Sequence, residues 1–328
     1  MQAAYFEKYG PATEVLKVGE RETPNPGPGE VRVRMHASGV NPSDVKKRAG
    51  SQSAGIEQGY VIPHSDGAGV IDAVGEGIAK SRIGERVWVY QAQYQRRFGT
   101  AAEYVTLPAA RVVHLPENVD FDTGACLGIP AMTAHRCVFA DGDVREQTVL
   151  VTGAGGRVGY YAVQWAKSAG ARVIATAGND GTVQHARDAG ADTVLNYRTD
   201  DVSQTVLELT DGAGVERVID VEFGANLATT LKLIRTNGII ATYASMGVRE
   251  PVLPFYPLMF KDVTVRFVLV YAMPESAKHQ AAEDITRFLR AGKLRHRVAE
   301  RYSLADIARA HEAIERGGVP GCVVIEIP

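Results

Sequence analysis

The chain has 328 residues, too many for one ordinary hydrophobic core, so two domains are expected. Hydrophobic residues make up 45% and charged residues 23%, the mixture of a globular protein, and the formal net charge is −2. A charge this close to zero gives no electrostatic footprint for nucleic acid or an anionic membrane, so neither is expected as a partner.

The first part of the chain reads as short strands separated by turns. Residues 31–35 (VRVRM) alternate at period two, directly after the breaker-rich run PNPGPG at 24–29. Residues 67–71 and 86–90 have the pattern of further strands. Together they predict a small, barrel-like β unit.

From about Gln147 the pattern changes to that of a parallel sheet. Residues 148–152 (TVLVT) form a continuous apolar run, as expected for a strand covered on both faces. Further β runs, most of them separated by helical patterns, follow at 172–176, 193–196, 217–221 and 238–243. This succession of βαβ units predicts a doubly wound α/β domain.

The last strand of this sheet leads to an expectation about assembly. Residues 263–270 supply a sixth β run, and the apolar stretch continues to Tyr271. An exposed apolar edge is a pairing liability unless it is covered, so we predict a homodimer joined edge to edge there, with a tetramer as the alternative. Helical patterns at 276–291 and 305–315 and a closing strand at 322–325 complete the chain.

A glycine-rich turn directly follows the first buried strand. Residues 153–159 read GAGGRVG, and the next helix carries apolar residues at three-and-four spacing until Gly170 stops it. Glycines let the backbone turn tightly and approach a pyrophosphate, and the helix N-terminus offers unpaired N–H groups and a positive dipole end. Strand, glycine turn and helix in this order predict a dinucleotide site.

The end of the second strand bears on which dinucleotide binds. Folds that bind NAD usually place Asp or Glu there to hold the ribose hydroxyls, but residues 177–179 read AGN. Asp180 follows, where a role as helix N-cap explains it as well as a ribose contact does. A 2′-phosphate is therefore tolerated, and Tyr197 and Arg198, after the next strand, are placed to reach it. NADPH is favoured over NADH.

Cysteine usage and the termini bear on the compartment. Cys126, Cys137 and Cys322 are an odd, widely spread set, which indicates a reducing compartment and small buried side chains. No apolar run reaches 18 residues, and the first eight, MQAAYFEK, lack the apolar stretch of a secretory signal. We expect a cytoplasmic protein that does not enter a membrane.

The stretch 150–167, with GRVG at 156–159 and QWAK at 164–167, resembles the signature of quinone oxidoreductases and ζ-crystallin. These proteins are medium-chain dehydrogenases/reductases. Further segments match in the same order over essentially the whole chain: GVNP at 39–42, SDGAGV at 65–70, GERV at 84–87, IPAMTA at 129–134 and AHE at 310–312.

The resemblance implies a GroES-like β-rich catalytic domain, residues 1–124 and 272–328, interrupted by a Rossmann NADP-binding domain, residues 125–271. The reaction is then expected in the cleft between the domains. By the same resemblance, Gly155 through Val158 would contact the pyrophosphate. The segment 267–269 would flank the nicotinamide, with Asn41 and Thr133 opposite it. The predicted cofactor set is Asn41, Lys46, Thr133, Ala154, Gly155, Gly156, Arg157, Val158, Gly159, Gly178, Asn179, Tyr197, Arg198, Asn226, Tyr243, Ala244, Ser245, Met246, Phe267, Val268 and Leu269.

Two residues depart from the family's pattern. Arg157 stands where the family usually has a third consecutive glycine, and its side chain is expected to point outward from the first turn of the helix. Lys46 stands where many members have a substrate-facing tyrosine, so it either favours polar or anionic acceptors or points to solvent. Asn41, Lys46, Tyr90 and Tyr94 are the candidates for orienting the acceptor, and no dedicated general acid is identifiable.

No metal is predicted. The zinc alcohol dehydrogenases of this superfamily hold their catalytic ion with Cys, His and Cys, whereas the matching positions here are 41–44 (NPSD), 65–66 (SD) and Ile129. His64 is one residue out of register and is expected to be hydrogen-bonded or to line the substrate site. Without a Lewis acid, quinones and activated enones fit better as acceptors than simple ketones.

The predicted function is therefore that of an NADPH-dependent quinone oxidoreductase, which transfers hydride from the nicotinamide to a small electron-poor acceptor. An enone or alkenal double-bond reductase using the same site is the alternative. A non-catalytic RNA-binding or crystallin-like protein is a third hypothesis, because ζ-crystallin relatives serve as lens proteins and bind RNA. The near-neutral charge and the absence of an aromatic-basic stripe speak against RNA.

Overall fold

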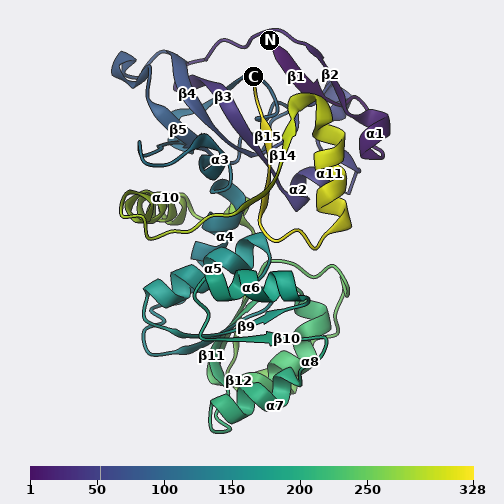
Figure 1. Ribbon diagram of the computed structural model, residues 1–328, viewed down its shortest axis with the longest axis vertical. Helices are drawn as coiled ribbons and strands as arrows, with labels where there is room; N and C mark the ends of the chain where they lie inside the picture. The colour runs from purple at the N-terminus through teal and green to yellow at the C-terminus, as the bar shows by residue number, and fades with distance from the viewer. Residues whose placement is uncertain (52) are drawn as a thin grey trace. The chain divides into compact units, whose positions relative to one another are not determined.

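The computed structural model describes residues 1–51 and 53–328, which divide into two compact units (Figure 1). The first unit comprises Met1–Ile129 and Ala282–Pro328, and the second comprises Pro130–Ala281. The sequence places the boundaries earlier, at 124/125 and 271/272. Each crossing in the structure lies within a helix, α4 (Gly128–Phe139) on the way out and α10 (Glu275–Arg290) on the way back.

A seven-stranded sheet is the framework of the first unit. Its strands run in the order β14-β15-β3-β4-β5-β7, β6 pairs with β3, and a separate two-stranded sheet joins β1 to β2. The four strands expected in this part of the chain are confirmed as β3, β4, β5 and β15. The strands are β1 (Gln2–Tyr5), β2 (Lys17–Glu20), β3 (Glu30–Val40), β4 (Asp66–Val74), β5 (Arg86–Val89), β6 (Tyr104–Pro108), β7 (Val112–His114), β14 (Val298–Ser303) and β15 (Cys322–Glu326).

Strand β3 delivers the chain to the start of α2. It alternates between buried and less buried side chains in its first half and is buried throughout from Ala37 to Val40. The Ala125 backbone packs closely on this end of the strand, because a Cβ on Gly39 would lie 2.0 Å from the Ala125 carbonyl oxygen. The first unit's helices are α1 (Ala12–Val15), α2 (Pro42–Arg48), α3 (Phe121–Gly124) and α11 (Ile307–Arg316), with 3₁₀ turns η1 (Ile56–Gln58), η2 (Lys80–Arg82), η3 (Ala109–Arg111) and η5 (Leu304–Asp306).

Helix α2 is anchored by a buried cation. The Arg48 side chain is 1% exposed, and its guanidinium donates to the Gly10 carbonyl and to the Glu315 carboxylate of α11. A buried guanidinium is tolerated only when its charge is paired and its hydrogens are used. This contact fixes α2 against α11 and so helps to place the residues at the start of α2.

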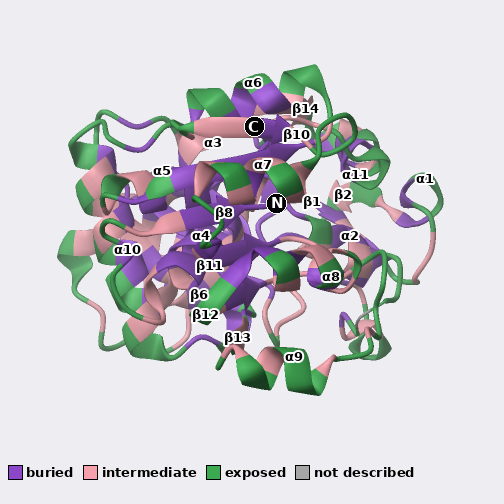
Figure 2. Cartoon of the chain, turned by 90° about the horizontal axis from the view of Figure 1, so that it is seen from below, coloured by how far each residue is buried: buried purple, intermediate pink, exposed green. Residues whose placement is uncertain are grey.

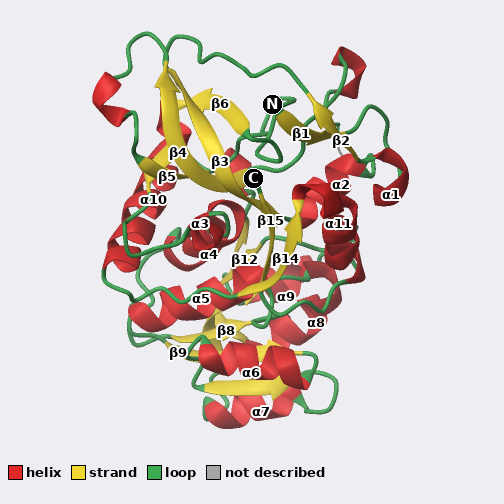
Figure 3. Cartoon of the chain, turned by 45° about the horizontal axis from the view of Figure 1, so that its top comes forward, coloured by secondary structure: helices red, strands yellow, loops and turns green. Residues whose placement is uncertain are grey.

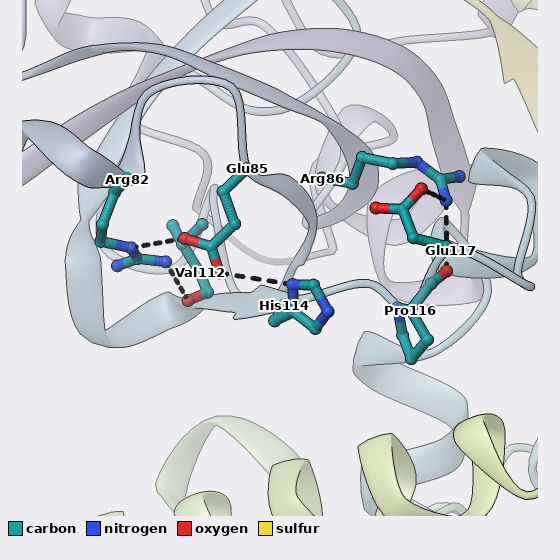
Figure 4. Close-up of polar contacts among 7 residues, drawn as sticks. All are labelled: Arg82, Glu85, Arg86, Val112, His114, Pro116 and Glu117. Atoms are coloured by element: carbon teal, nitrogen blue, oxygen red, sulfur yellow. Dashed lines mark hydrogen bonds and ion pairs between the residues drawn. The ribbon is translucent and has the colours of Figure 1, made fainter.

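Polar contacts also tie the outer end of β5 to its neighbours (Figure 4). Arg82 of η2 donates to Glu85 at 2.7 Å and to the Val112 carbonyl at 3.2 Å. Arg86 donates to the Pro116 carbonyl at 3.2 Å. Because side-chain donors reach backbone acceptors here, the turn before β5 and the segment after β7 are held to the same edge of the sheet.

The second unit is a six-stranded parallel sheet in the order β10-β9-β8-β11-β12-β13. The predicted doubly wound domain is confirmed: α5 packs against α6 and α7 against α8, on opposite faces of the strands (Figure 1, Figure 3). The strands are β8 (Thr148–Val151), β9 (Arg172–Ala177), β10 (Thr193–Asn196), β11 (Val215–Asp220), β12 (Ile234–Thr242) and β13 (Thr264–Phe267). The helices are α5 (Arg157–Ser168), α6 (Asp180–Asp188), α7 (Val202–Leu209), α8 (Phe223–Leu233) and α9 (Phe255–Phe260), with the 3₁₀ turn η4 (Val270–Ala272).

One expectation for this unit needs correction. The sixth strand is shorter than the apolar run 263–270 indicates, because the chain leaves the sheet after Phe267 and turns into η4. Helix α5 carries the predicted apolar spacing, but burial is wider than that spacing requires, because every residue from Gly159 to Ala166 is buried. An all-round buried helix is packed on more than its sheet-facing side.

Exposed apolar side chains gather in the segment before and within β13. Helix α9 is largely exposed, in contrast to the buried strands β8 and β11 (Figure 2). Val252 is 91% exposed and Phe260 75% exposed, and Phe267 of β13 is 68% exposed. No helix in the described part of the chain is long and apolar enough to cross a membrane.

Candidate cofactor and acceptor sites

The glycine-rich turn lies between the end of β8 and the start of α5, with Gly156 as N-cap of the helix. Gly153 has a φ of 60°, a left-handed conformation that favours glycine. A Cβ on Gly155 would lie 2.3 Å from the Thr182 Cβ, and one on Gly159 would lie 2.5 Å from the Gly153 carbonyl oxygen. Neither position therefore accepts a side chain, and the two glycines let the turn pack tightly at the N-terminus of a 12-residue helix, an arrangement that suits a pyrophosphate.

The start of α6 closes on the same turn. Asn179 is the N-cap, because its side chain accepts the Thr182 N–H at 2.9 Å, and the Thr182 hydroxyl oxygen accepts the Asn179 N–H at 3.1 Å. The suggestion that Asp180 is the N-cap is therefore wrong by one residue; Asp180 opens the first turn instead. Asn and Asp are equally good caps, so two adjacent candidates could not be ranked from sequence. The Asn179 side chain is used by the helix.

Tyr197 lies beside Gly178, another residue of the predicted cofactor set. A Cβ on Gly178 would lie 2.5 Å from the Tyr197 hydroxyl oxygen, so the hydroxyl occupies the space that a side chain would take. Tyr197 is nevertheless 54% exposed, and the Arg198 guanidinium lies 6.0 Å from its ring centre. Ala177, in the place of the usual acidic residue, is buried at the end of β9. The structure thus joins two segments that the sequence could only suggest as neighbours.

A buried carboxylate holds the ends of β8 and β11 together, at the point where the strand order reverses. Asp220 accepts the Thr152 hydroxyl at 2.7 Å and the Asn226 side-chain amide at 2.8 Å. Asn226, a predicted cofactor residue, is therefore placed by Asp220. Two residues after Asp220, Glu222 accepts the Met246 and Gly247 N–H groups at 2.8 and 3.0 Å and fixes the loop after β12.

Six of the predicted cofactor residues line one pocket of about 440 Å³ in the second unit. They come from the ends of β12 and β13, where parallel strands present their carboxyl ends. Arg249 is the charged residue among those that line it. The predicted residues in this pocket are Tyr243, Ala244, Ser245, Phe267, Val268 and Leu269.

Three other predicted residues of this unit behave differently. Met246 is exposed and is not among those that line the pocket. Thr133 is buried on α4. Arg157 was expected to point outward, but it is only half-exposed, and its Nη1 atom is shielded from solvent. The length of the arginine side chain allows its head to fold back although its Cα starts a helix.

In the first unit, Asn41 lies directly after β3 and its amide nitrogen donates to the Asp66 carboxylate at 2.8 Å. The same carboxylate oxygen, Oδ2, accepts the Ile129 N–H at 2.7 Å. Asp44, on the first turn of α2, accepts the Asn41 backbone N–H at 2.8 Å. Asp66 is fully buried, and burial raises its pKa to about 8. Three segments far apart in the sequence thus meet around one carboxyl group.

The lysines of α2 divide between the surface and the interior. Lys46, the sequence candidate, is half-exposed, whereas Lys47 is buried, with Nζ 3.5 Å from the Gln93 carbonyl oxygen. Burial lowers the pKa of Lys47, and the carboxylates of Asp44 and Asp66 act in the opposite direction. An inward-facing cation beside Asp66 was not predicted, because periodicity on a seven-residue helix does not separate adjacent lysines.

The two tyrosine candidates differ in the same way. The Tyr90 ring is buried and its hydroxyl donates to the Ala110 carbonyl at 2.9 Å, so we place it in the support of the loop after β5. Tyr94 is half-exposed in that loop, and its backbone N–H donates to the Gln91 carbonyl. Tyr94 therefore stays a candidate for orienting the acceptor.

A chain of hydrogen bonds fixes the backbone of Asp66 from behind. Thr100 donates its hydroxyl hydrogen to the Asp66 carbonyl at 2.7 Å, so it accepts from Ser38 at 2.7 Å. Ser38 therefore accepts from His64 Nδ1 at 2.8 Å. His64 Nε2 is then the acceptor for His311 Nε2 at 2.9 Å. The expectation that His64 is hydrogen-bonded is confirmed, and burial lowers its pKa to about 3, which keeps this chain neutral.

The positions that correspond to zinc ligands do not fit a zinc ion. They present no Cys or His: the carboxylates among them are Asp44, which accepts the Asn41 N–H, and Asp66, and the rest are Asn41, Pro42, Ser43, Ser65 and Ile129. Asp66 already accepts Asn41 and Ile129. Within residues 1–51 and 53–328, no three His, Cys, Asp or Glu side chains are grouped so that they could hold a metal ion. All three cysteines are free and buried, as expected.

Comparisons with known proteins agree with this architecture. A family model described as an alcohol dehydrogenase GroES-like domain matches residues 27–117, and one described as a zinc-binding dehydrogenase matches 158–287. A quinone oxidoreductase of Pseudomonas aeruginosa is 30% identical over 98% of this chain and 98% of its own. A 2-haloacrylate reductase of a Burkholderia species is 29% identical over 99% and 98%. A structure of Escherichia coli quinone oxidoreductase complexed with NADPH has a TM-score of 0.88 at 25% identity and covers 99% of this chain and 100% of that one.

Proposed function

Because the chain belongs to the quinone oxidoreductase family of the medium-chain dehydrogenases/reductases, we propose that it uses NADPH to reduce a quinone or a related electron-poor acceptor, without a metal ion. The observation that carries the proposal is the tight glycine turn, with Gly155 and Gly159 packed too closely for a side chain, at the N-terminus of α5. It supports a dinucleotide rather than a mononucleotide, because the pocket at the ends of β12 and β13 lies in the same unit.

The residues present fit a nicotinamide dinucleotide. The turn 153–159 would hold the pyrophosphate, Gly178 and Tyr197 the adenosine ribose with its 2′-phosphate, and the pocket of Tyr243 and Phe267 the nicotinamide end. Bound there, the dinucleotide supplies a hydride to the acceptor. Most of the side chains that line the pocket are apolar, which suits the flat nicotinamide ring.

On the acceptor side we propose that Asn41 and Tyr94 orient the acceptor, with Lys46 as a half-exposed cation nearby. Orientation is the contribution expected of such groups, since a near-attack geometry is worth orders of magnitude in rate. No zinc is needed to polarise an acceptor that already takes hydride readily. Dialysis against a strong chelator should leave activity unchanged, and activity that is lost and then restored by zinc would refute this part of the proposal.

The test is a substrate panel with the purified protein. Rates with NADPH and NADH are measured on a simple quinone, a medium-chain 2-alkenal and an aldehyde, by loss of absorbance of the reduced nicotinamide. We expect the quinone with NADPH to give the highest kcat/KM. Turnover of none of the three, together with no binding of NADPH in a fluorescence titration, would refute the proposal.

A second candidate, an enone double-bond reductase, is favoured by one observation. The 2-haloacrylate reductase relative covers nearly the whole chain, and its name describes reduction of an activated alkene. A haloacrylate carries a carboxylate, and Arg249 supplies a cation at the rim of the pocket. A kcat/KM that is higher for 2-haloacrylate than for the quinone would favour this candidate.

We propose that the protein is a homodimer joined at β13. The exposed side chains of Val252, Phe255, Phe260 and Phe267 form an apolar surface next to the open edge of this strand. Exposed apolar surface beside an unpaired strand edge is normally covered. Light scattering should give twice the mass of the chain at micromolar concentration, and a monomer would contradict the proposal.

A further inference from the structure

We propose that Asp66 is a positioning residue that fixes which way the side-chain amide of Asn41 faces. The proposal rests on the proposed function to the extent that Asn41 orients the acceptor there. Asp66 itself is too enclosed to touch a substrate: it is fully buried, and a Cβ on Gly128 would lie 2.1 Å from its Oδ1 atom. Its role is therefore exercised through Asn41.

The direction of the Asn41 amide follows from the donors around Asp66 Oδ2. This oxygen accepts the Asn41 Nδ2–H group at 2.8 Å and the Ile129 N–H at 2.7 Å. Two N–H donors already point at it, so a proton on this carboxyl group is carried by Oδ1. A flipped Asn41 would place its own oxygen against Oδ2, so that two acceptors would face each other in a buried site. Asn41 is therefore held with its nitrogen toward Asp66, while its side-chain oxygen accepts the Asp44 N–H in the capping box of α2.

Asp66 can impose this direction because it is fixed on all sides. Its backbone carbonyl accepts the Thr100 hydroxyl, at the end of the chain that starts at His311. Its Oδ1 atom has no hydrogen-bond partner within the described residues and is packed against Gly128. The Asp44 carboxylate of α2 raises the pKa of Asp66 and the Lys47 ammonium lowers it. The charge of Asp66 in turn raises the pKa of the Cys126 thiol.

The consequence is a fixed choice of polar group for the acceptor. A free asparagine offers either an N–H or a carbonyl oxygen to its ligand, whereas an asparagine clamped at Nδ2 offers one arrangement only. A single arrangement raises the fraction of bound acceptor in the reactive orientation, which is expressed in kcat more than in KM. This distinguishes positioning from a merely structural role, which would lower the amount of folded enzyme without changing either constant.

The kinetic experiment compares three variants with the wild type. Asp66→Ala removes the clamp and should lower kcat/KM by about a hundredfold, mostly through kcat. Asp66→Asn keeps an oxygen in the place of Oδ2 and matches the shape of the protonated carboxyl group, so it should remain within about fivefold. Asp72→Ala removes a carboxylate from the same strand, one that pairs with Arg32 at 2.9 Å, and should leave both constants unchanged. Asp66→Asn as impaired as Asp66→Ala would overturn the proposal.

A readout that needs no turnover separates this inference from the proposed function. In the wild type the Asn41 side-chain NH₂ signal should be protected from hydrogen exchange, and Asp66→Ala should remove the protection while Asp66→Asn and Asp72→Ala keep it. Unchanged protection in Asp66→Ala would overturn the proposal, even if no acceptor is reduced. If Asp66→Ala does not fold, the wild type decides by itself: an Asn41 Nδ2–H signal protected by the Asp66 contact is expected, and rapid exchange of both Nδ2 hydrogens would overturn the proposal.

Discussion

The two candidate sites of this chain are built in opposite ways. The cofactor turn uses seven neighbouring residues, 153–159, between a buried strand and a helix, and only Gly153 and Gly155 meet residues outside this segment, Val221 and Thr182. The acceptor side gathers Asn41, Asp66 and Ile129 from three separated segments and joins them through one carboxylate. The first site depends mainly on the backbone conformation of one continuous segment. The second depends on how separated segments pack together.

This difference predicts how each site fails. A glycine turn fails sterically, because the added atom would overlap with Thr182 at Gly155 and with the Gly153 carbonyl at Gly159. The carboxylate cluster fails electrostatically, because burial has already displaced its proton equilibrium. Mutations that separate the two modes, taken from the largest expected effect to the smallest, test whether the contrast is real.

The largest effect is expected from Gly155→Ala. The new Cβ would lie 2.3 Å from the Thr182 Cβ and 2.7 Å from the Thr182 carbonyl oxygen, so the first turn of α6 must move away from the glycine turn. We expect NADPH affinity to fall about a hundredfold, or about 2.7 kcal/mol, in a fluorescence titration. Gly156→Ala is the matched comparison, because its nearest contact would be 3.2 Å and affinity should change far less. Equal affinities of the two variants would contradict the steric account.

The next effect concerns the pH dependence of stability. The pKa of Asp66 is raised to about 8, so between roughly pH 4 and pH 8 the folded state keeps a proton that the unfolded state has lost. Stability therefore falls as pH rises through this window, by at most about 1.4 kcal/mol per pH unit. Asp66→Asn has no such proton. The free energy of unfolding of this variant, relative to that of the wild type, should therefore rise by about 2 kcal/mol from pH 6 to pH 7.5.

Urea unfolding at the two pH values measures this difference directly. Asp66→Asn also removes a charge that acts on Lys47 and Cys126, so the difference between the two proteins reports the titration of this buried cluster around Asp66. Asp72→Asn, on the same strand but half-exposed and paired with Arg32, should follow the wild type. Parallel curves for Asp66→Asn and the wild type would show that burial does not displace the Asp66 equilibrium.

The same contrast explains what the sequence could and could not predict. The strands of the parallel sheet and the turn 153–159 were predictable, because apolar runs and glycines report local conformation. The end of β13 at Phe267 was not, because the apolar pattern continues while the hydrogen bonding to β12 stops. The N-cap was misplaced between Asp180 and Asn179, which are adjacent and chemically equivalent caps.

The acceptor side was less predictable for a physical reason. Asp66 lies 25 residues from Asn41, and Ile129 lies 63 residues from Asp66, so no spacing rule joins them. Lys47 was missed in favour of Lys46, because a one-residue difference on a short helix decides which lysine faces the interior. Sequence patterns show where a backbone turns; buried hydrogen bonds between distant segments appear only in the fold.

The smallest effect is expected from Tyr197→Phe, which tests the choice of dinucleotide. The Tyr197 hydroxyl lies beside Gly178, and the side chain is about half exposed, in the region where the ribose 2′-phosphate is proposed to bind. Ala177 presents no acidic side chain that would repel the phosphate. A hydrogen bond to a charged phosphate contributes roughly 1.5–3 kcal/mol, so its loss should lower kcat/KM with NADPH by at least about tenfold. NADH lacks that phosphate, and its kcat/KM should stay nearly unchanged. Tyr256→Phe, an exposed tyrosine on α9, is the control and should alter neither. A wild type that uses NADH as well as NADPH would contradict the argument and would make Asp180, on the first turn of α6, the expected partner of the ribose hydroxyls instead.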